Sequence, residues 1–253
     1  MKPLILVTND DGISAPGLKA LVSVMKKIGC VAVIAPDKPQ SGTGHAITIN
    51  SAVLIEKVSL FGCDYEYSCS GTPVDCVKIA VHKILPRIPD LCVSGINHGS
   101  NSSVNVIYSG TMSAAVEGAI EGIPSLGFSL CDVSVDADFA TAKYYARMIA
   151  SSALKHNLPH GVCLNINIPA VKKSNINGIK ICRQAEAYWN EKYEEKKDDN
   201  GKIHYWLTGK FQNRDKGADT DEWALSHNFV SVVPVQYDIT AHRFMEELKE
   251  WRF

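Results

Sequence analysis

The chain has 253 residues, 45% of them hydrophobic, which is enough for one large domain, or a domain with an appendage, around a dense core. Lysine plus arginine number 26 against 27 for aspartate plus glutamate, and this balance excludes the basic surface that nucleic-acid or anionic-membrane binding requires. No window reaches 18 apolar residues, and the first residues lead into a short strand-like run without a cleavable leader. We therefore expect a soluble, cytoplasmic protein that binds neither nucleic acid nor membrane. The eight cysteines form no Cys-x-x-Cys pair and are expected to be reduced core residues.

The first part of the chain alternates strand-like apolar runs with helical patterns, which is typical of an α/β fold with a mostly parallel sheet flanked by helices. Glycine and proline at the borders of these runs mark where elements begin and end. The strands expected are 4–8, 31–35, 91–94, 125–129, 163–168 and 179–183, with β-like runs at 52–58 and 65–69 that form a hairpin or a sheet extension. The helices expected are 15–28, 73–85, 111–122 and 136–156.

The composition changes after about residue 185, where 186–216 is dense in charged and aromatic residues. Asn200-Gly201 is a strong hairpin-turn signal in the middle of this segment, so we expect a protruding β-hairpin arm. A strand at 229–235 and a closing helix at 241–251 follow. The chain therefore divides into a core (1–185), an arm (186–217) and a C-terminal strand and helix (218–253). On an exposed arm, four aromatic side chains would leave an apolar stripe typical of a partner surface: Trp189, Tyr193, Tyr205 and Trp206.

The segment Asn9-Asp10-Asp11-Gly12 places two adjacent carboxylates directly after the first strand. Side chains alternate between the two faces of a strand, so these two aspartates can converge on one ion only where the extended geometry ends. Alone, the segment would be read as an ordinary acidic turn. Two other glycine-containing polar segments, 36–45 and 95–102, also follow strands. Ligands of open parallel sheets bind outside the carboxyl ends of the strands, so the three segments are expected to share one crevice.

The residue types in these segments indicate phosphate chemistry. Two carboxylates with hydroxyl and amide oxygens suit a hard cation such as Mg²⁺ or Mn²⁺ and not Zn²⁺, whose sites prefer cysteine and histidine. Ser109-Gly110-Thr111 stands at a helix start, where free backbone N–H groups and the helix dipole favour an anion. Ser109 or Thr111 alone would be read as an ordinary N-cap, and Ser41 alone as a turn residue. Their joint occurrence with the acidic segment favours a functional site.

These segments also resemble the ordered signature of the survival protein E (SurE) family of metal-dependent nucleotidases. The resemblance covers most of residues 4–130 and continues more weakly through 164–169, 219–221 and 230–234. Its motifs are Val7-Thr8-Asn9-Asp10-Asp11-Gly12 with Pro16-Gly17, Ala35-Pro36-Asp37 with Gln40-Ser41-Gly42, Gly71-Thr72-Pro73 with Asp75-Cys76, Ser94-Gly95-Ile96-Asn97 with Gly99 and Asn101, and Tyr108-Ser109-Gly110-Thr111 with Ala114-Ala115 and Glu117-Gly118.

The resemblance implies a Rossmann-like core and hydrolysis of nucleoside 5′-monophosphates to nucleoside and phosphate, with activity on 3′-nucleotides and, in some members, short polyphosphate. It implies one divalent cation per subunit, Mg²⁺ or Mn²⁺, and a homodimer or homotetramer built by exchange of C-terminal arms. The residues it assigns to the metal are Asp10, Asp11, Ser41 and Asn97, those assigned to catalysis are Asp10, Asp11 and Asn97, and those assigned to phosphate are Gly42, Asn97, Ser109, Gly110 and Thr111.

The chain departs from the family pattern at Ala185-Glu186-Ala187-Tyr188, where the family commonly has a Gly-x-Arg segment. This departure bears on the contacts of the arm and on the preferred base.

Two mechanisms remain open: attack by a metal-activated water that Asp11 orients or deprotonates, and direct attack by an aspartate to form an aspartyl-phosphate. His98 and His45 are candidate general acids outside the catalytic set. Two other functions also remain open. One is a non-catalytic, metal-dependent nucleotide-binding or sensing protein, and the other is a structural oligomerisation protein built around the arm.

Overall fold

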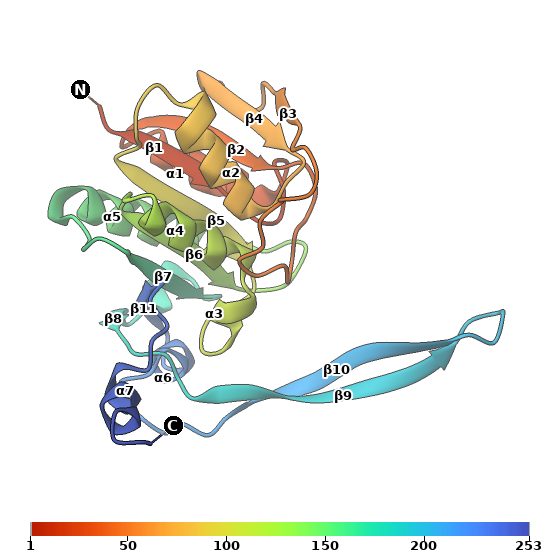
Figure 1. The fold of residues 1–253 in the computed structure, drawn as a ribbon. Coiled ribbons are helices and arrows are strands. Elements are labelled where there is room, and N and C mark those ends of the chain that lie inside the picture. Colours follow the sequence, from red (N-terminus) through yellow and green to blue (C-terminus); the bar gives the residue numbers. More distant parts are fainter. Residues whose placement is uncertain (1, 253) are drawn as a thin grey trace.

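The fold is a nine-stranded, mostly parallel sheet with helices on both faces, and a separate two-stranded hairpin projects from it (Figure 1). The computed structural model describes residues 2–252. The strand order is β3-β4-β2-β1-β5-β6-β7-β11-β8, in which only β3 on β4 and β11 on β7 are antiparallel. The predicted α/β class is confirmed. The strands of the sheet are β1 (Leu4–Thr8), β2 (Cys30–Pro36), β3 (Ile55–Lys57), β4 (Tyr65–Cys69), β5 (Leu91–His98), β6 (Ser125–Cys131), β7 (Val162–Pro169), β8 (Gly178–Ile181) and β11 (Phe229–Gln236).

The two faces of the sheet carry separate hydrophobic cores, because side chains of the central strands alternate between them. Ile5 and Val7 of β1 pack against one helical layer, α1 (Pro16–Met25) and α5 (Ala140–His156). Leu4 and Leu6 face the layer formed by α2 (Pro73–Ile79) and α4 (Gly110–Ile120). Both faces of β1 are covered, which explains its continuous apolar run. The remaining helical segments are η1 (Ala80–Ile84), α3 (Asn105–Tyr108), η2 (Lys173–Asn175), α6 (Asp221–Ser226) and α7 (His242–Leu248).

Several element ends differ from the prediction. The expected helix at 15–28 ends at Met25, and the one at 136–156 begins at Ala140, whose N–H is accepted by Asp138 Oδ1 at 2.8 Å. Strand β5 continues to His98 instead of ending at residue 94, because a register shift between Ser94 and Asn97 carries the ladder past Gly95. The short helices α3 and α6 were not predicted. Each is too short to show a periodic pattern in the sequence.

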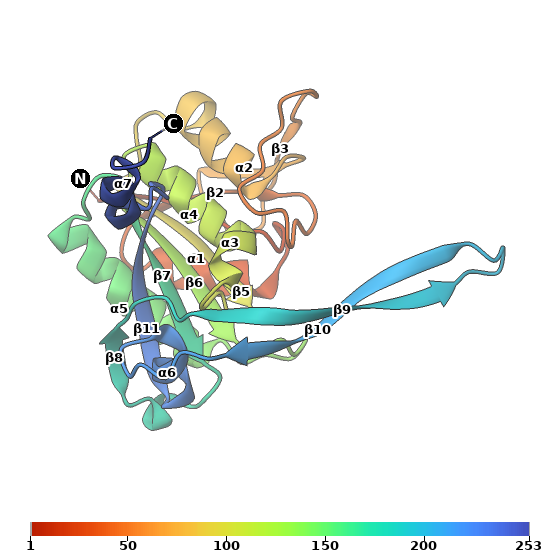
Figure 2. The same ribbon diagram turned by 60° about the horizontal axis from the view of Figure 1, so that its bottom comes forward.

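The arm is an antiparallel hairpin of β9 (Ala187–Lys197) and β10 (Ile203–Asn213), as predicted. Gly201 takes the positive φ of +75° that the turn requires, and the Asp198 N–H donates to the Lys202 carbonyl at 3.0 Å. Figure 2 shows the hairpin extending away from the body of the molecule. Tyr193 and Tyr205 are exposed on one face of the hairpin, whereas Trp206, next to Tyr205 in β10, is exposed on the other face, so only part of the predicted aromatic stripe is present.

The chain returns to the core sheet after the arm. Strand β11 lies between β7 and β8 in the sheet. The segment predicted as a separate C-terminal part therefore supplies the second strand from this edge of the core sheet. The Arg183 guanidinium joins the two ends of the arm, with Nη1 2.5 Å from Asp215 Oδ2 and Nε 2.9 Å from Asp219 Oδ2. The division into three domains itself stays a prediction.

All eight cysteines are free thiols, and five of them are buried, whereas Cys30 is exposed. No helix within residues 2–252 is long and apolar enough to cross a membrane.

Gly17 at the start of α1 generates a prediction about stability. A Cβ atom at this position would lie 1.9 Å from the Ile96 carbonyl oxygen, so α1 approaches the irregular part of β5 only because Gly17 has no side chain. We expect Gly17→Ala to lower the free energy of unfolding by about 3 kcal/mol through overpacking, measured by urea denaturation. Lys19→Ala, an exposed change on the same helix, should stay within about 0.5 kcal/mol of the wild type. Equal stability of Gly17→Ala and wild type would contradict this packing.

Candidate active site

Three loops that follow neighbouring strands form one pocket at the carboxyl edge of the sheet. β2, β1 and β5 are adjacent and parallel, so the segments after them emerge side by side. The pocket has a volume of about 470 Å³. Six of the predicted site residues line it, and they come from the loops after β1 and β2, from the end of β5 and from the start of α4: Asp10, Asp11, Ser41, Gly42, Asn97 and Ser109.

Asp10 is buried beneath the first turn of α4. The Thr111 hydroxyl donates to Asp10 Oδ1, and a Cβ atom on Gly110 would lie 2.6 Å from the Asp10 Cβ. The helix start can therefore close over the carboxylate only because residue 110 is glycine. Burial raises the pKa of Asp10 to about 6; the hydrogen bond from the Thr111 hydroxyl opposes this rise, and the adjacent charge of Asp11 adds to it.

Asp11 is more accessible than Asp10 and is less tightly held. Burial raises the pKa of its carboxyl group, whereas the nearby imidazole of His98 lowers it. His98 Nδ1 lies 3.8 Å from Asp11 Oδ2, which is beyond hydrogen-bond distance. Among the described residues this buried oxygen has no hydrogen-bond partner. Within residues 2–252 this oxygen therefore has an ionisable neighbour in His98 but no donor within hydrogen-bond distance.

Asn97 reaches the pocket from the end of β5. Its amide nitrogen donates to the carbonyl oxygens of His98 at 3.2 Å and Gly99 at 2.9 Å. With the nitrogen engaged in this way, the amide oxygen is the atom that Asn97 can offer to a cation or a substrate hydrogen.

The Ser41-Gly42 loop is joined to the segment after β1 by a backbone hydrogen bond, in which the Gln40 N–H donates to the Asp10 carbonyl at 2.8 Å. Gly42 has a positive φ of +74°, and both Ser41 and Gly42 are exposed to the pocket. The loop therefore brings one hydroxyl and one unobstructed backbone segment beside the two carboxylates.

The donor set of the pocket fits a hard divalent cation. Asp10 and Asp11 are two carboxylates whose ionisation burial opposes, and a cation would relieve both. In residues 2–252 there is no cluster of three or more histidine, cysteine, aspartate or glutamate side chains that could hold an ion. Ser41 and Asn97 would therefore have to complete the coordination with neutral oxygens, an arrangement found with Mg²⁺ and Mn²⁺.

Two hydroxyl groups at the start of α4 make hydrogen bonds within the protein. Ser109 is the N-cap, and its hydroxyl oxygen accepts the Met112 N–H at 3.0 Å. Thr111 is fully buried, and its hydroxyl is directed at Asp10. In this structure Thr111 contacts a carboxylate of the protein, and phosphate binding by Gly42, Asn97, Ser109, Gly110 and Thr111 stays a prediction.

Sequence reasoning missed a network of buried asparagines that holds the loop after β5. Asn167 Oδ1 accepts the Asn101 N–H at 2.8 Å, and Asn165 Nδ2 donates to the Asn101 carbonyl at 2.8 Å. The Asn101 amide in turn donates to Ser129 at 2.9 Å. Two asparagines that alternate with isoleucine in a buried strand were the available signal, because polar side chains there need partners.

The structure also brings in residues from outside the three loops. Trp189 of the arm, with Asn105 and Tyr108 of α3, lines the same pocket. Of the two candidate general acids, His98 lies in the pocket, whereas His45 lies outside it with its Nε2 2.9 Å from Glu117 Oε2.

Comparisons with known proteins agree with this fold. The model of the family "Survival protein SurE" matches residues 5–191. A protein of Flavobacterium psychrophilum called 5′-nucleotidase SurE is 61% identical over 99% of this chain and 98% of its own length. One with the same name from Cytophaga hutchinsonii is 54% identical over 100% and 98%. The crystal structure of the SurE protein from Aquifex aeolicus superimposes with a TM-score of 0.85 at 36% identity, covering 98% of each chain.

The asparagine network generates a prediction. Asn167→Ala leaves the buried Asn101 N–H without its acceptor and the buried Asn165 Oδ1 without its donor, and we expect it to lower the free energy of unfolding by about 2 kcal/mol. Urea denaturation measures this loss. Asn175→Ala, at an exposed position, serves as the control and should change stability little. The network would have no stabilising role if both variants unfolded at the wild-type midpoint.

Proposed function

The chain belongs to the survival protein SurE family, and we propose that its pocket hydrolyses nucleoside 5′-monophosphates to nucleoside and phosphate. The observation that carries this proposal is the adjacent pair in the pocket, with Asp10 buried beneath the start of α4 and Asp11 partly buried beside it. Relatives called 5′-nucleotidase SurE match nearly the whole chain, arm included. Action on 3′-nucleotides and short polyphosphate belongs to the same proposal, because both present a terminal phosphate to the same groups.

Asp10, Asp11, Ser41 and Asn97 would hold one Mg²⁺ or Mn²⁺ per chain. Bound there, such an ion supplies Lewis-acid polarisation of a phosphoryl oxygen and lowers the pKa of a water molecule. The support for this assignment is the orphaned oxygen of Asp11 and the raised pKa of both carboxyl groups.

The two carboxylates are suited to different tasks. Asp10 is fixed by the Thr111 hydroxyl and closed in by α4, so it acts as a rigid ligand. Asp11 has an oxygen without a donor and is free to accept the proton of an attacking water. Direct attack by an aspartate is the alternative mechanism. Acid quenching with labelled substrate decides between the two, because only direct attack leaves phosphate on the protein.

The start of α4 and the Ser41-Gly42 loop would bind the transferred phosphate. The Ser109 oxygen accepts from Met112, so its own hydrogen remains available for donation to a phosphate oxygen. Gly110 contributes a backbone N–H at the positive end of the helix dipole.

We further propose a cytoplasmic homodimer or homotetramer joined by exchange of the C-terminal arms. Tyr193 and Tyr205, exposed on one face of the hairpin, support a protein partner for this surface. The eight free thiols support a reducing compartment.

Replacing Asp10 tests the proposed activity. We expect Asp10→Asn to reduce phosphate release from AMP, assayed with Mg²⁺ or Mn²⁺, by at least about 100-fold, because a metal ligand loses its charge. The Thr111 hydroxyl can still donate to an amide oxygen at this position, so the fold should persist, as checked by circular dichroism.

Asp136→Asn, an exposed change of the same kind, should retain full activity. Wild-type protein that binds AMP in the presence of metal and releases no phosphate would instead indicate a nucleotide-sensing protein.

A further inference from the structure

Besides the two carboxylates, the pocket is lined by aromatic and aliphatic side chains. Tyr108 ends α3, immediately before Ser109, and Trp189 stands at the root of the arm; both line the pocket that contains Asp10 and Asp11. Val133, from the loop after β6, adds an exposed aliphatic side chain to the same pocket. The pocket is therefore amphipathic, with charge and hydroxyl groups in one part and rings in another.

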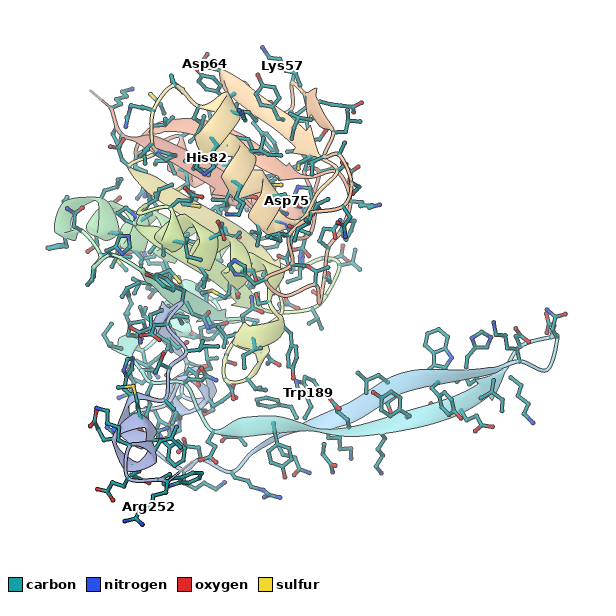
Figure 3. The ribbon with its side chains drawn as sticks, in the orientation of Figure 1. Lys57, Asp64, Asp75, His82, Trp189 and Arg252 are labelled. Carbon is teal, nitrogen blue, oxygen red and sulfur yellow. The ribbon has the colours of Figure 1, made fainter. Side chains whose placement is uncertain are left out.

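Trp189 is held in a defined orientation. Its indole Nε1–H donates to Asn105 Oδ1 at 2.8 Å, which fastens the ring to α3. Phe211, its cross-strand neighbour on β10, packs edge to face against it at 5.6 Å between ring centroids. Even so, 43% of Trp189 remains exposed. Figure 3 shows this side chain at the root of the arm beside the core. An oriented ring with an open surface is ready to accept another flat group.

A second pocket continues from this wall. It has a volume of about 430 Å³, lies between α3 and the hairpin, and shares Tyr108 and Trp189 with the first pocket. Glu191 and Leu207 also line it. The Glu191 carboxylate disfavours a second phosphate in this space and can accept hydrogen bonds from an amino group.

We propose that Trp189 and Tyr108 bind the base of the nucleotide, with the purine ring stacked on Trp189 and directed into the pocket beside Glu191. This inference rests on the proposed function and deepens it, because the phosphate at Asp10 and Asp11 leaves the rest of the substrate to occupy the aromatic side. A ring as large as adenine or guanine gains most from such stacking. The arm thus takes part in substrate selection as well as in assembly.

Two variants of Trp189 distinguish stacking on the nucleotide base from the hydrogen bond that attaches the arm to α3. Trp189→Phe and Trp189→Leu both lose the hydrogen bond to Asn105, whereas only phenylalanine keeps an aromatic face. We measure kcat and KM for AMP and for ribose 5-phosphate, which carries the same phosphate and sugar without a base. For AMP, we expect KM to rise about 10-fold in Trp189→Leu and less than about 3-fold in Trp189→Phe, since base stacking of this kind is worth roughly 5- to 150-fold in affinity.

For ribose 5-phosphate, both variants should keep the wild-type KM within about twofold, because no base is present to stack. Trp206→Ala is the matched control: this tryptophan is exposed on the same hairpin and lines neither of the two pockets, so its loss should leave both substrates unaffected.

Equal increases in KM for both substrates, or the same KM for AMP in the leucine and phenylalanine variants, would overturn the inference. Trp189 would then serve only to attach the arm to α3 through Asn105. Unchanged KM for AMP in both variants would also overturn it. Wild-type protein that releases phosphate from neither substrate would instead refute the proposed function, so the two failures are distinguishable. Circular dichroism and gel filtration of both variants establish that the hairpin is still assembled.

Discussion

Two adjacent carboxylates follow β1, one buried and one partly buried, and this is the constraint on which the rest of the site depends. Burial of Asp10 and partial burial of Asp11 raise the pKa of both carboxyl groups, so the fold must supply compensating contacts. For Asp10 it does so with the Thr111 hydroxyl and the first turn of α4, which approaches closely because residue 110 is glycine. For Asp11 the protein leaves one oxygen without a donor. This oxygen is the atom of the pair that we propose to complete with a cation.

The surrounding framework keeps these groups in place through contacts between distant parts of the chain. The irregular end of β5 sets Asn97 at the pocket, and α1 packs against that irregularity at Gly17. Asn165 and Asn167 on β7 hold the loop that follows β5. Buried strands and helices thus hold the carboxylates and Asn97 in place. The more exposed Ser41-Gly42 loop and Trp189 at the start of the arm form the rest of the pocket lining.

The sequence allowed the sheet class and the convergence of three loops to be predicted, because apolar runs mark strands and parallel strands place their carboxyl ends together. It also allowed the hairpin arm to be predicted from Asn200-Gly201. It did not show that Thr111 would contact Asp10, that Asn167 would contact Asn101, or that Trp189 would reach α3. These partners are 101, 66 and 84 residues apart, and local patterns carry no information about such pairs. For the same reason, the C-terminal strand could be recognised as a strand without its place between β7 and β8 being known.

The central claim is that the Asp10–Asp11 pair is completed by a divalent cation. Titration of the protein with Mn²⁺, followed by electron paramagnetic resonance of the free ion, tests it most directly because it does not depend on turnover. One ion should bind per wild-type chain, and Asp11→Asn should weaken that binding by at least about tenfold, since the oxygen without a partner would lose its charge. Wild-type protein that binds no Mn²⁺, or an Asp11→Asn variant that binds it as tightly as the wild type, would contradict the claim.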